Sequence, residues 1–157
     1  MKMTNSKSKI IAIGIILLII SCKTYTIPAD SFRSQMINAN SENMKVVEIN
    51  NPLTFGKITY SSNNIKSLVV IDKNGNELIK ENKPSIEMRV TDKNGKKYHF
   101  YFDTVILEND TLKGGRSRFM KNLTREIPMN NIVKIEVQDG GKNFKYQNWE
   151  NTVGNTS

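Results

Sequence analysis

The sequence predicts an all-β protein, a single small antiparallel barrel or sandwich built as a meander of hairpins. From residue 45 onward the apolar runs are short and are separated by Asn, Asp and Gly turns, so none reaches helical length. The tetrapeptide Asp-Lys-Asn-Gly occurs twice between such runs, at 72–75 and 92–95. The alternation of side chains in 86–90 and 98–102 is typical of strands with one buried face.

The segment before this region, residues 22–44, is predicted to be a flexible tether with at most one short helix. It is rich in Ser, Asn, Thr and Ala and poor in apolar residues. Asp30 and Ser31 offer helix N-caps, and Phe32 and Met36 are spaced to share one helical face. A disordered chain of roughly 20 residues has an average span of about 25 Å, so the domain is expected to stay close to whatever holds its N-terminus.

Ten strands are expected in the β domain, residues 45–146, because each is a short run bounded by turn residues. They are predicted at 46–49, 57–60, 67–71, 77–79, 85–91, 97–102, 104–107, 111–113, 125–127 and 133–137. Residues 147–157 contain only Trp149 and Val153 as sizeable apolar side chains, and they are predicted to form a disordered tail.

Matching of apolar side chains predicts the register of the hairpin around 92–95. A two-residue loop would place Val90 opposite His99, whereas a three-residue loop places Val90 opposite Tyr98. The second arrangement gathers the apolar side chains on one face, and it requires a left-handed conformation at Gly95. For the other copy of the tetrapeptide both registers pair apolar residues, and the choice stays open.

The first 21 residues have the composition of a secretory signal peptide. Three lysines are their only charges, residues 10–20 are all apolar or glycine, and Ser21 precedes Cys22. The apolar run is shorter than the ~20 residues that a membrane-spanning helix needs. An uncleaved signal anchor or a buried core helix is the alternative, and Gly14 and the β-branched isoleucines suit neither.

Residues 19–22, Ile-Ile-Ser-Cys, resemble the lipobox of bacterial lipoproteins, with isoleucine in place of the more usual leucine at position 19. The resemblance implies that residues 1–21 are removed as a signal peptide and that Cys22 is diacylglycerylated, which makes a membrane the first partner. Lys23 is not the aspartate that resembles an inner-membrane retention signal in some Gram-negative bacteria. The resemblance therefore implies an anchor in the outer membrane, facing the periplasm.

One basic segment is a candidate site for an anion. Its members, with no acidic residue between them, are Lys113, Arg116, Arg118, Lys121 and Arg125. Guanidinium groups beside flexible glycine backbone can bind the phosphate or carboxylate groups of anionic envelope polymers or lipid headgroups. The alternative is a solvated loop. Loss of the signal-peptide lysines lowers the net charge from +8 to +5, which is ordinary for solubility, so nucleic acid is not a predicted partner.

The sequence predicts no catalytic residues, no metal site and no cofactor. Asp103, Glu108 and Asp110 could supply a carboxylate pair for glycoside hydrolysis, but surface carboxylates at this density are common. His99 is the only histidine, and neither a nucleophile nor further zinc ligands accompany it. Residues 72–76 lack the glycine and glutamate of an EF-hand loop, so they are read as a turn.

Two further resemblances are short. Asp-Thr-aliphatic tripeptides at 103–105 and 110–112 are similar to an O-glycosylation sequon of some Gram-negative envelope proteins, which makes Thr104 and Thr111 candidate acceptors. The order of strand, tight polar turn and closing strand at 125–137 is similar to the ending of small SH3-like barrels. That likeness is architectural and carries no functional residues across.

These observations lead us to expect a lipid-anchored, non-enzymatic protein of the bacterial cell envelope, which binds another envelope component or assists an assembly. The alternatives are an envelope hydrolase acting on glycan or lipid, and a carrier of a small ligand. A pocket lined by Asp103, Glu108 and His99 would favour the hydrolase, and a closed apolar cavity would favour the carrier. An exposed edge strand would favour partner binding.

Overall fold

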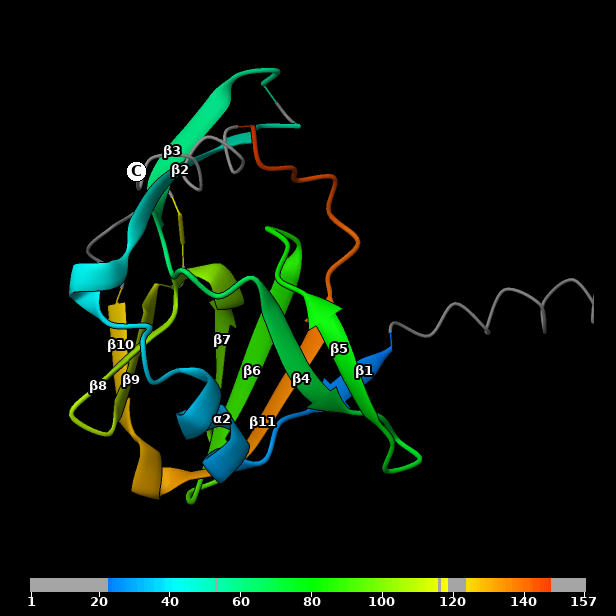
Figure 1. The fold of residues 1–157 in the computed structure, drawn as a ribbon, viewed down its shortest axis with the longest axis vertical. Coiled ribbons are helices and arrows are strands. Elements are labelled where there is room, and N and C mark those ends of the chain that lie inside the picture. The colour runs from blue at the N-terminus through cyan, green and yellow to red at the C-terminus, as the bar shows by residue number, and fades with distance from the viewer. Residues whose placement is uncertain (1–22, 53, 116, 119–123, 148–157) are drawn as a thin grey trace, which may run out of the picture.

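The computed structural model describes residues 23–52, 54–115, 117–118 and 124–147, in which the chain forms antiparallel sheets, one α-helix and short 3₁₀ turns (Figure 1). The strands are β1 (Thr24–Thr26), β2 (Lys45–Asn50), β3 (Lys57–Ser62), β4 (Ser67–Ile71), β5 (Glu77–Glu81), β6 (Ile86–Asp92), β7 (Lys97–Tyr101), β8 (Ile106–Glu108), β9 (Thr111–Gly115), β10 (Thr124–Pro128) and β11 (Ile132–Asp139). The helical elements are α2 (Ala29–Gln35), η2 (Ser41–Asn43), η3 (Phe102–Thr104) and η4 (Met129–Asn131).

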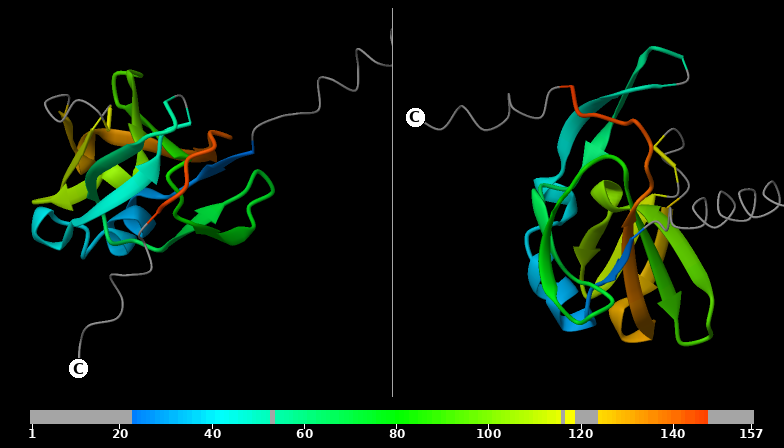
Figure 2. Two further views of the ribbon diagram at one scale, coloured as in Figure 1. Left: turned by 90° about the horizontal axis from the view of Figure 1, so that it is seen from above. Right: turned by 90° about the vertical axis from the view of Figure 1, so that its right-hand side faces the viewer.

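Three sheets make up the fold. A six-stranded sheet has the order β5-β4-β1-β11-β6-β7, a three-stranded sheet has the order β10-β9-β8, and β2 and β3 form a separate hairpin (Figures 1 and 2). All pairings are antiparallel. The predicted all-β class is therefore confirmed, and the sheets do not close into a barrel but are compatible with a small sandwich.

Each of the ten predicted strands is present, with ends within two residues of the prediction. The strand predicted at 104–107 begins only at Ile106, because the chain first turns through η3. The hairpin at 92–95 has the predicted register, with Val90 opposite Tyr98, and Gly95 has the expected left-handed φ of +76°. The other copy of the tetrapeptide takes the same form, with φ of +84° at Gly75.

The structure corrects the predicted tether over residues 22–44, because residues 24–44 belong to the folded domain. Strand β1 lies inside the six-stranded sheet, between β4 and β11. Helix α2 then covers one face of the sheet, and Phe32 and Met36 are buried there. β1 has only three residues, too few to show a periodic pattern, so the low density of apolar residues around it predicts flexibility instead. The short helix that the spacing of Phe32 and Met36 indicates is present as α2, although it begins at Ala29, before the predicted caps Asp30 and Ser31.

The side chain of Gln35 extends the sheet where β1 ends. Its Nε2 donates to the Val69 carbonyl at 3.0 Å, and its Oε1 accepts from the Val69 amide at 2.7 Å. The side-chain amide of Gln35 thus makes the pair of hydrogen bonds to β4 that the backbone of a neighbouring strand would make. It provides partners for the Val69 N–H and C=O groups beyond the end of β1. This contact fixes the C-terminal end of α2 to the sheet.

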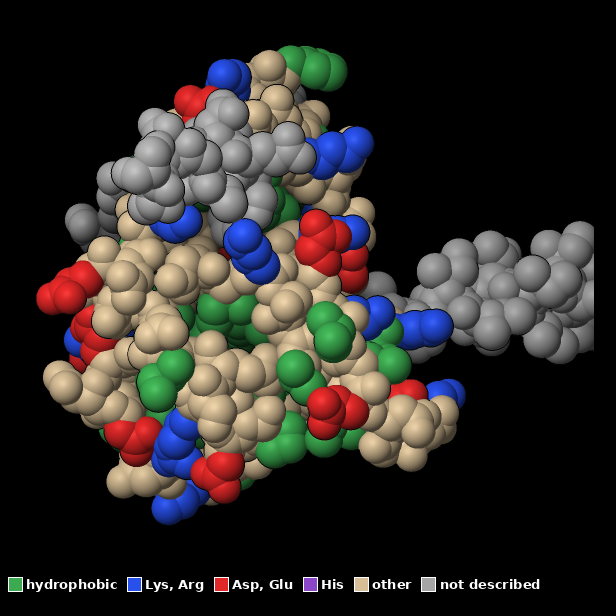
Figure 3. All heavy atoms as spheres, viewed as in Figure 1, with side chains coloured by type: hydrophobic (Ala, Val, Ile, Leu, Met, Phe, Trp, Pro, Cys, Tyr) green, Lys and Arg blue, Asp and Glu red, His purple; other side chains and the backbone are tan. Residues whose placement is uncertain are grey.

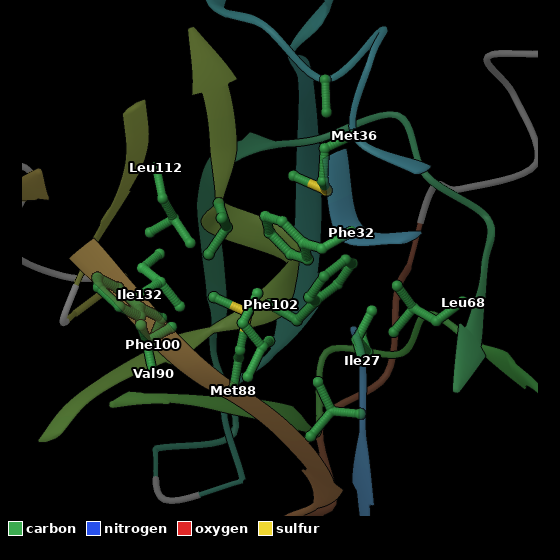
Figure 4. Close-up of a cluster of buried hydrophobic side chains, with 14 of the residues drawn as sticks. Ile27, Phe32, Met36, Leu68, Met88, Val90, Phe100, Phe102, Leu112 and Ile132 are labelled. Carbon is green, nitrogen blue, oxygen red and sulfur yellow. The ribbon is translucent and has the colours of Figure 1, made fainter. Parts of the chain in front are cut away.

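The main core lies between α2 and the strands. Figure 4 shows Ile27, Phe32 and Phe102 directed into one cluster, which also receives Met88 and Leu112. Leu112 comes from the three-stranded sheet, so that sheet shares this core with the larger one. The core therefore draws on segments from residue 27 to residue 137, and all the described layers except the β2–β3 hairpin depend on it.

Candidate functional site

The β2–β3 hairpin projects from the body as the most prominent feature of the fold (Figures 1 and 2). Its strands pair from Lys45 opposite Ser62 to Asn50 opposite Lys57. Alternate side chains point inward and form a second apolar cluster, with members Val47, Ile49, Ile58, Tyr60, Phe144 and Tyr146. The last two come from the segment after β11, which runs back along β2.

This returning segment is held by main-chain contacts as well. The Asn50 amide donates to the Lys145 carbonyl at 3.2 Å, and the Gln147 amide donates to the Glu48 carbonyl at 2.8 Å. Residue 147, the first of the predicted disordered tail, is thus bonded to the hairpin, and 148–157 lie outside the described residues. These contacts hold strand β2 along its second half, from Glu48 to Asn50.

The tip of the hairpin carries an exposed aromatic side chain. Phe55 is 98% exposed and has a φ of +54°, a left-handed conformation that a bulky residue rarely adopts. The loop is closed below it by the Asn51 amide, which donates to the Gly56 carbonyl at 2.8 Å. Figure 3 shows a hydrophobic side chain at this end of the molecule. On the outer face of the hairpin, Val46 is 66% exposed.

Four polar side chains from four segments meet below the hairpin, and we call them the clamp: Tyr60, Asp103, Arg118 and Tyr146. Asp103 in η3 is fully buried. Its carboxylate accepts from Arg118 Nη2 at 2.9 and 3.0 Å, and from the Tyr146 hydroxyl at 3.1 Å. The Tyr60 hydroxyl from β3 also donates to it. The clamp thus joins the hairpin, η3, the loop after β9 and the C-terminal segment.

The Arg118 guanidinium lies in an aromatic cage. Its central carbon is 3.8 Å from the ring centre of Tyr101, 5.0 Å from that of Tyr60 and 5.3 Å from that of Phe144. Nη2 also donates to the Pro84 carbonyl. The Arg118 side chain is only 2% exposed, and Nε and Nη1 have no hydrogen-bond partner in the described part of the chain. Cation–π contacts partly offset their burial.

Burial dominates the electrostatics of the clamp. It raises the pKa of Asp103, while the Arg118 charge and the three donated hydrogen bonds act in the opposite direction. Burial and the neighbouring Asp103 charge raise the pKa values of Tyr60 and Tyr146 far above neutrality, so both phenols stay protonated as donors. Separation of Arg118 from Asp103 would leave each charge unpaired in the interior, at a high cost in free energy. The clamp therefore holds the four segments together and gives the hairpin a rigid base.

The predicted basic segment does not form one cationic surface in the described residues. Arg118 points inward, and Lys113 pairs with Glu108 at 3.2 Å. Arg125 is exposed on β10, and Arg116 and Lys121 lie outside the described residues. Arg118 is therefore not available to an external anion, because its charge is already neutralised by Asp103 in the interior. Lys113 is partly exposed, but its charge is also paired, with Glu108.

Gly114 in this segment has a packing role rather than the predicted flexibility. Gly114 lies in β9, opposite Arg125 of β10. A Cβ atom at Gly114 would lie 2.8 Å from Cδ1 of Phe100, closer than a carbon contact allows. Glycine is required here because the two sheets approach each other closely.

The three carboxylates considered for acid–base chemistry do not converge, since each has its own partner. Asp103 is in the clamp, and Asp110 accepts from Arg33 Nε at 2.7 Å, a contact that lowers its pKa. Hydrogen bonds from Ser41 and Lys113 lower the pKa of Glu108 to about 2. A pocket lined by Asp103, Glu108 and His99 is not among those that the described residues form.

The remaining predicted sites have simple surroundings. His99 is exposed opposite Arg89, as predicted, and Asp72 Oδ1 caps its turn by accepting from the amides of Asn74 and Asn76 at 2.8 Å. No group of three metal-binding side chains occurs within the described residues.

The two candidate glycosylation sites are both half-buried and differ in the hydrogen bond of the hydroxyl. The Thr104 hydroxyl donates to the Tyr101 carbonyl at 2.8 Å. Thr111 follows a tight turn in which Asn109 and Asp110 have φ of 50° and 53°, and its hydroxyl donates to the nearby Asn109 carbonyl at a longer 3.3 Å. Cys22, the candidate lipidation site, lies outside the described residues, which begin at Lys23.

No protein-family model, curated protein or solved structure matches the chain. Of the helices in the described ranges, none is both long enough and apolar enough to cross a bilayer. Function therefore has to be argued from the geometry of the hairpin and from the sequence before it.

Proposed function

We propose that this protein is a lipid-anchored, non-enzymatic component of the bacterial cell envelope that binds a protein partner through the tip of its β2–β3 hairpin. The observation that carries the proposal is Phe55, an aromatic side chain 98% exposed at the end of a projecting hairpin whose base is fixed. The anchor is Cys22, in the outer membrane and facing the periplasm, as the lipobox resemblance implies.

The tip has the properties of a preformed contact. Aromatic side chains are the commonest binding hot spots, because they bury a large area while losing few rotatable bonds. The left-handed backbone at Phe55 costs about 1–3 kcal/mol. The side chain is 98% exposed, so burial among the described residues does not offset this cost. Burial of the ring in a partner would add favourable free energy that exceeds this cost. Because the clamp already holds the hairpin rigid, little conformational entropy of the hairpin is lost on binding.

Binding is favoured over hydrolysis by the pairing of the carboxylates. An acid–base pair needs one carboxyl that can protonate and a second facing it across a substrate. Here Glu108 and Asp110 are held ionised by Lys113 and Arg33, and Asp103 is closed off from solvent. The pocket that His99 lines has a volume of about 20 Å³, room for about one water molecule.

Replacing Phe55 by Ser should abolish partner binding and leave the fold intact. Loss of a central aromatic anchor commonly costs 2 kcal/mol or more, which is about a 30-fold loss of affinity. Ile37→Ser is a matched control, since Ile37 is also exposed, at 74%, but lies after α2. The measurement is quantitative cross-linking in intact cells followed by identification of the bound proteins. An unchanged set of partners for the Phe55 variant would contradict the proposal.

Replacing Cys22 by Ser should release the protein from membranes and abolish incorporation of labelled palmitate. A chain without its thiol cannot receive the diacylglyceryl group, and it then has no stable anchor. Cell fractionation and metabolic labelling measure the two effects. Full retention of a labelled Cys22→Ser protein in the membrane fraction would rule out the anchor without bearing on Phe55.

A further inference from the structure

We infer that the surface around the start of β1 lies directly against the anionic phospholipid headgroups of the leaflet that holds the protein. We call this surface, with its four lysines Lys23, Lys66, Lys80 and Lys83, the basal face. The inference rests on the lipid anchor proposed above, and it adds an orientation on the membrane and a preference for anionic lipid.

Little chain separates the lipid-bearing residue from the folded domain. Thr24 already pairs with Gln138 of β11, so the sheet begins two residues after Cys22. Two residues extend at most about 7 Å. A lipid on Cys22 therefore holds the start of β1 at the headgroup layer, whereas the tether predicted from sequence would have allowed about 25 Å.

The basal face combines an apolar groove with lysine side chains. A groove of about 280 Å³ opens here, and its floor is apolar, formed by Tyr25, Leu68, Ile86 and Val137. Lys23, Lys80 and Lys83 line the same groove, and the Lys80 ammonium lies 4.6 Å from the ring centre of Tyr25. Figure 3 shows basic side chains beside hydrophobic ones next to the start of β1.

The charge of the basal face is net positive. Lys66 adjoins the groove because its carbonyl accepts from the Asn82 amide at 2.9 Å, one residue before Lys83. Two carboxylates, Glu81 and Asp139, are present against the four lysines, and Glu81 is 3.3 Å from Lys83. Each lysine near an anionic surface increases binding about fivefold. The two net positive charges would therefore bind a membrane weakly by themselves, but they are enough to orient a domain that a covalent lipid already holds at the surface.

An edge strand with exposed apolar side chains adjoins the basal face. β5 is an outer strand of the six-stranded sheet, and its apolar side chains flank Lys80 on both faces of this edge: Leu78, 37% exposed, shares the face of Lys80, and Ile79, 76% exposed, lies on the opposite face. Apolar side chains beside lysines suit the boundary between headgroups and acyl chains. The β2–β3 hairpin projects from another end of the molecule, so contact at the basal face leaves Phe55 free to meet a partner (Figures 1 and 2).

The test uses the mature lipidated chain in vesicles of phosphatidylglycerol or of phosphatidylcholine. Cys22 is the only cysteine and is consumed by the lipid, so Ile79→Cys and Phe55→Cys can each carry a single fluorophore. In phosphatidylglycerol at 0.1 M salt we expect a water-soluble quencher to reach the label at 79 at least threefold less than the label at 55. The difference should shrink in phosphatidylcholine and at 1 M salt, where the screening length falls from ~10 to ~3 Å.

Two charge variants, each made in the Ile79→Cys protein, provide the matched comparison. Lys80→Ser with Lys83→Ser should remove the protection of the label at 79. Lys93→Ser with Lys97→Ser loses the same charge at the far end of β6, about 20 Å from Ile86, and should keep the protection. Equal quenching at 79 and 55 in phosphatidylglycerol, or equal effects of the two variants, would overturn the inference.

Two other occupants of the basal face give distinct results that also overturn it. Protection at 79 that is equal in both lipids and insensitive to salt would indicate an apolar occupant. Protection that rises with the number of proteins per vesicle would indicate a second copy of this chain. Flotation of the vesicles reports the anchor itself, so loss of anchoring is distinguished from loss of headgroup contact.

Discussion

A chain that begins at Lys45 is expected not to fold. The truncation removes β1 and α2, and with them the buried side chains of Ile27, Phe32 and Met36. Burial of side chains of this size stabilises by about 1.5–3 kcal/mol each, so about 5–9 kcal/mol would be lost. That is comparable with the whole stability of a typical domain, about 5–15 kcal/mol.

The loss of backbone pairing adds to this effect. β1 is an inner strand, so its removal separates β4 and β5 from β11 and leaves unpaired groups on both sides. The Gln35 contact with Val69 disappears as well. Strands β4 and β5 would then form a hairpin with little to hold it on the rest of the sheet, and an isolated hairpin is at best marginally stable.

Far-ultraviolet circular dichroism and urea denaturation of chains beginning at residue 23 and at residue 45 measure this effect. The longer chain should unfold cooperatively, and the shorter one should show no transition. Phe32→Ala, with an expected loss of about 3–5 kcal/mol, and Ile37→Ala, with little expected loss, separate the role of the core from that of chain length. A cooperative transition at the same midpoint for both chains would show that residues 23–44 are dispensable.

The elements that could be predicted are those in which local patterns and tertiary contacts agree. The period-two alternation along β6 and β7 leaves only one register that pairs Val90 with Tyr98, so the hairpin follows from the sequence. The Asn109-Asp110 turn is similar, since both residues tolerate the positive φ that a two-residue hairpin loop requires.

The elements that were missed depend on partners distant in sequence. β1 has three residues, and only its pairing with β11, more than 100 residues later, makes it a strand. Arg118 lies in a run of cations, where a surface position is the usual expectation. Its burial depends on Asp103 and on rings from β3, β7 and the C-terminal segment, which only the tertiary fold brings together. One signal in the sequence was Asp103, a single carboxylate between Phe102 and Val105, which are both fully buried in the structure. A carboxylate in such surroundings indicates a buried acid that needs a cationic partner.

Replacing Arg118 by Met should destabilise the protein by about 3–5 kcal/mol, because it leaves the Asp103 charge unpaired in the interior. Arg33→Met is the matched control. Arg33 pairs with Asp30 and Asp110, whose side chains are 98% and 56% exposed, so the expected loss is about 0–1 kcal/mol. Free energies of unfolding from urea titrations give both values.

A double-mutant cycle separates the ion pair from the packing of the side chain. Asp103→Asn alone should also be costly, since it leaves a buried guanidinium without its counter-charge. Asn keeps an oxygen that accepts from Tyr60 and Tyr146, so Arg118→Met with Asp103→Asn should recover most of the loss. A double variant as unstable as the sum of the single ones would show that the pair is not coupled.

The deficit of the Arg118→Met protein should also depend on pH. Without the guanidinium, burial holds the pKa of Asp103 further above its ordinary value, so the native state binds a proton more tightly than the unfolded chain. Stability relative to wild type is then lost as pH rises from the raised pKa of Asp103 in the wild type to its still higher pKa in the variant, and it is regained below the first of these two values. Glu108 and Glu136, with pKa values of about 2, weaken both proteins equally in acid and cancel in the difference. A deficit that is constant from pH 3 to 8 would show that Asp103 is not left charged in the interior.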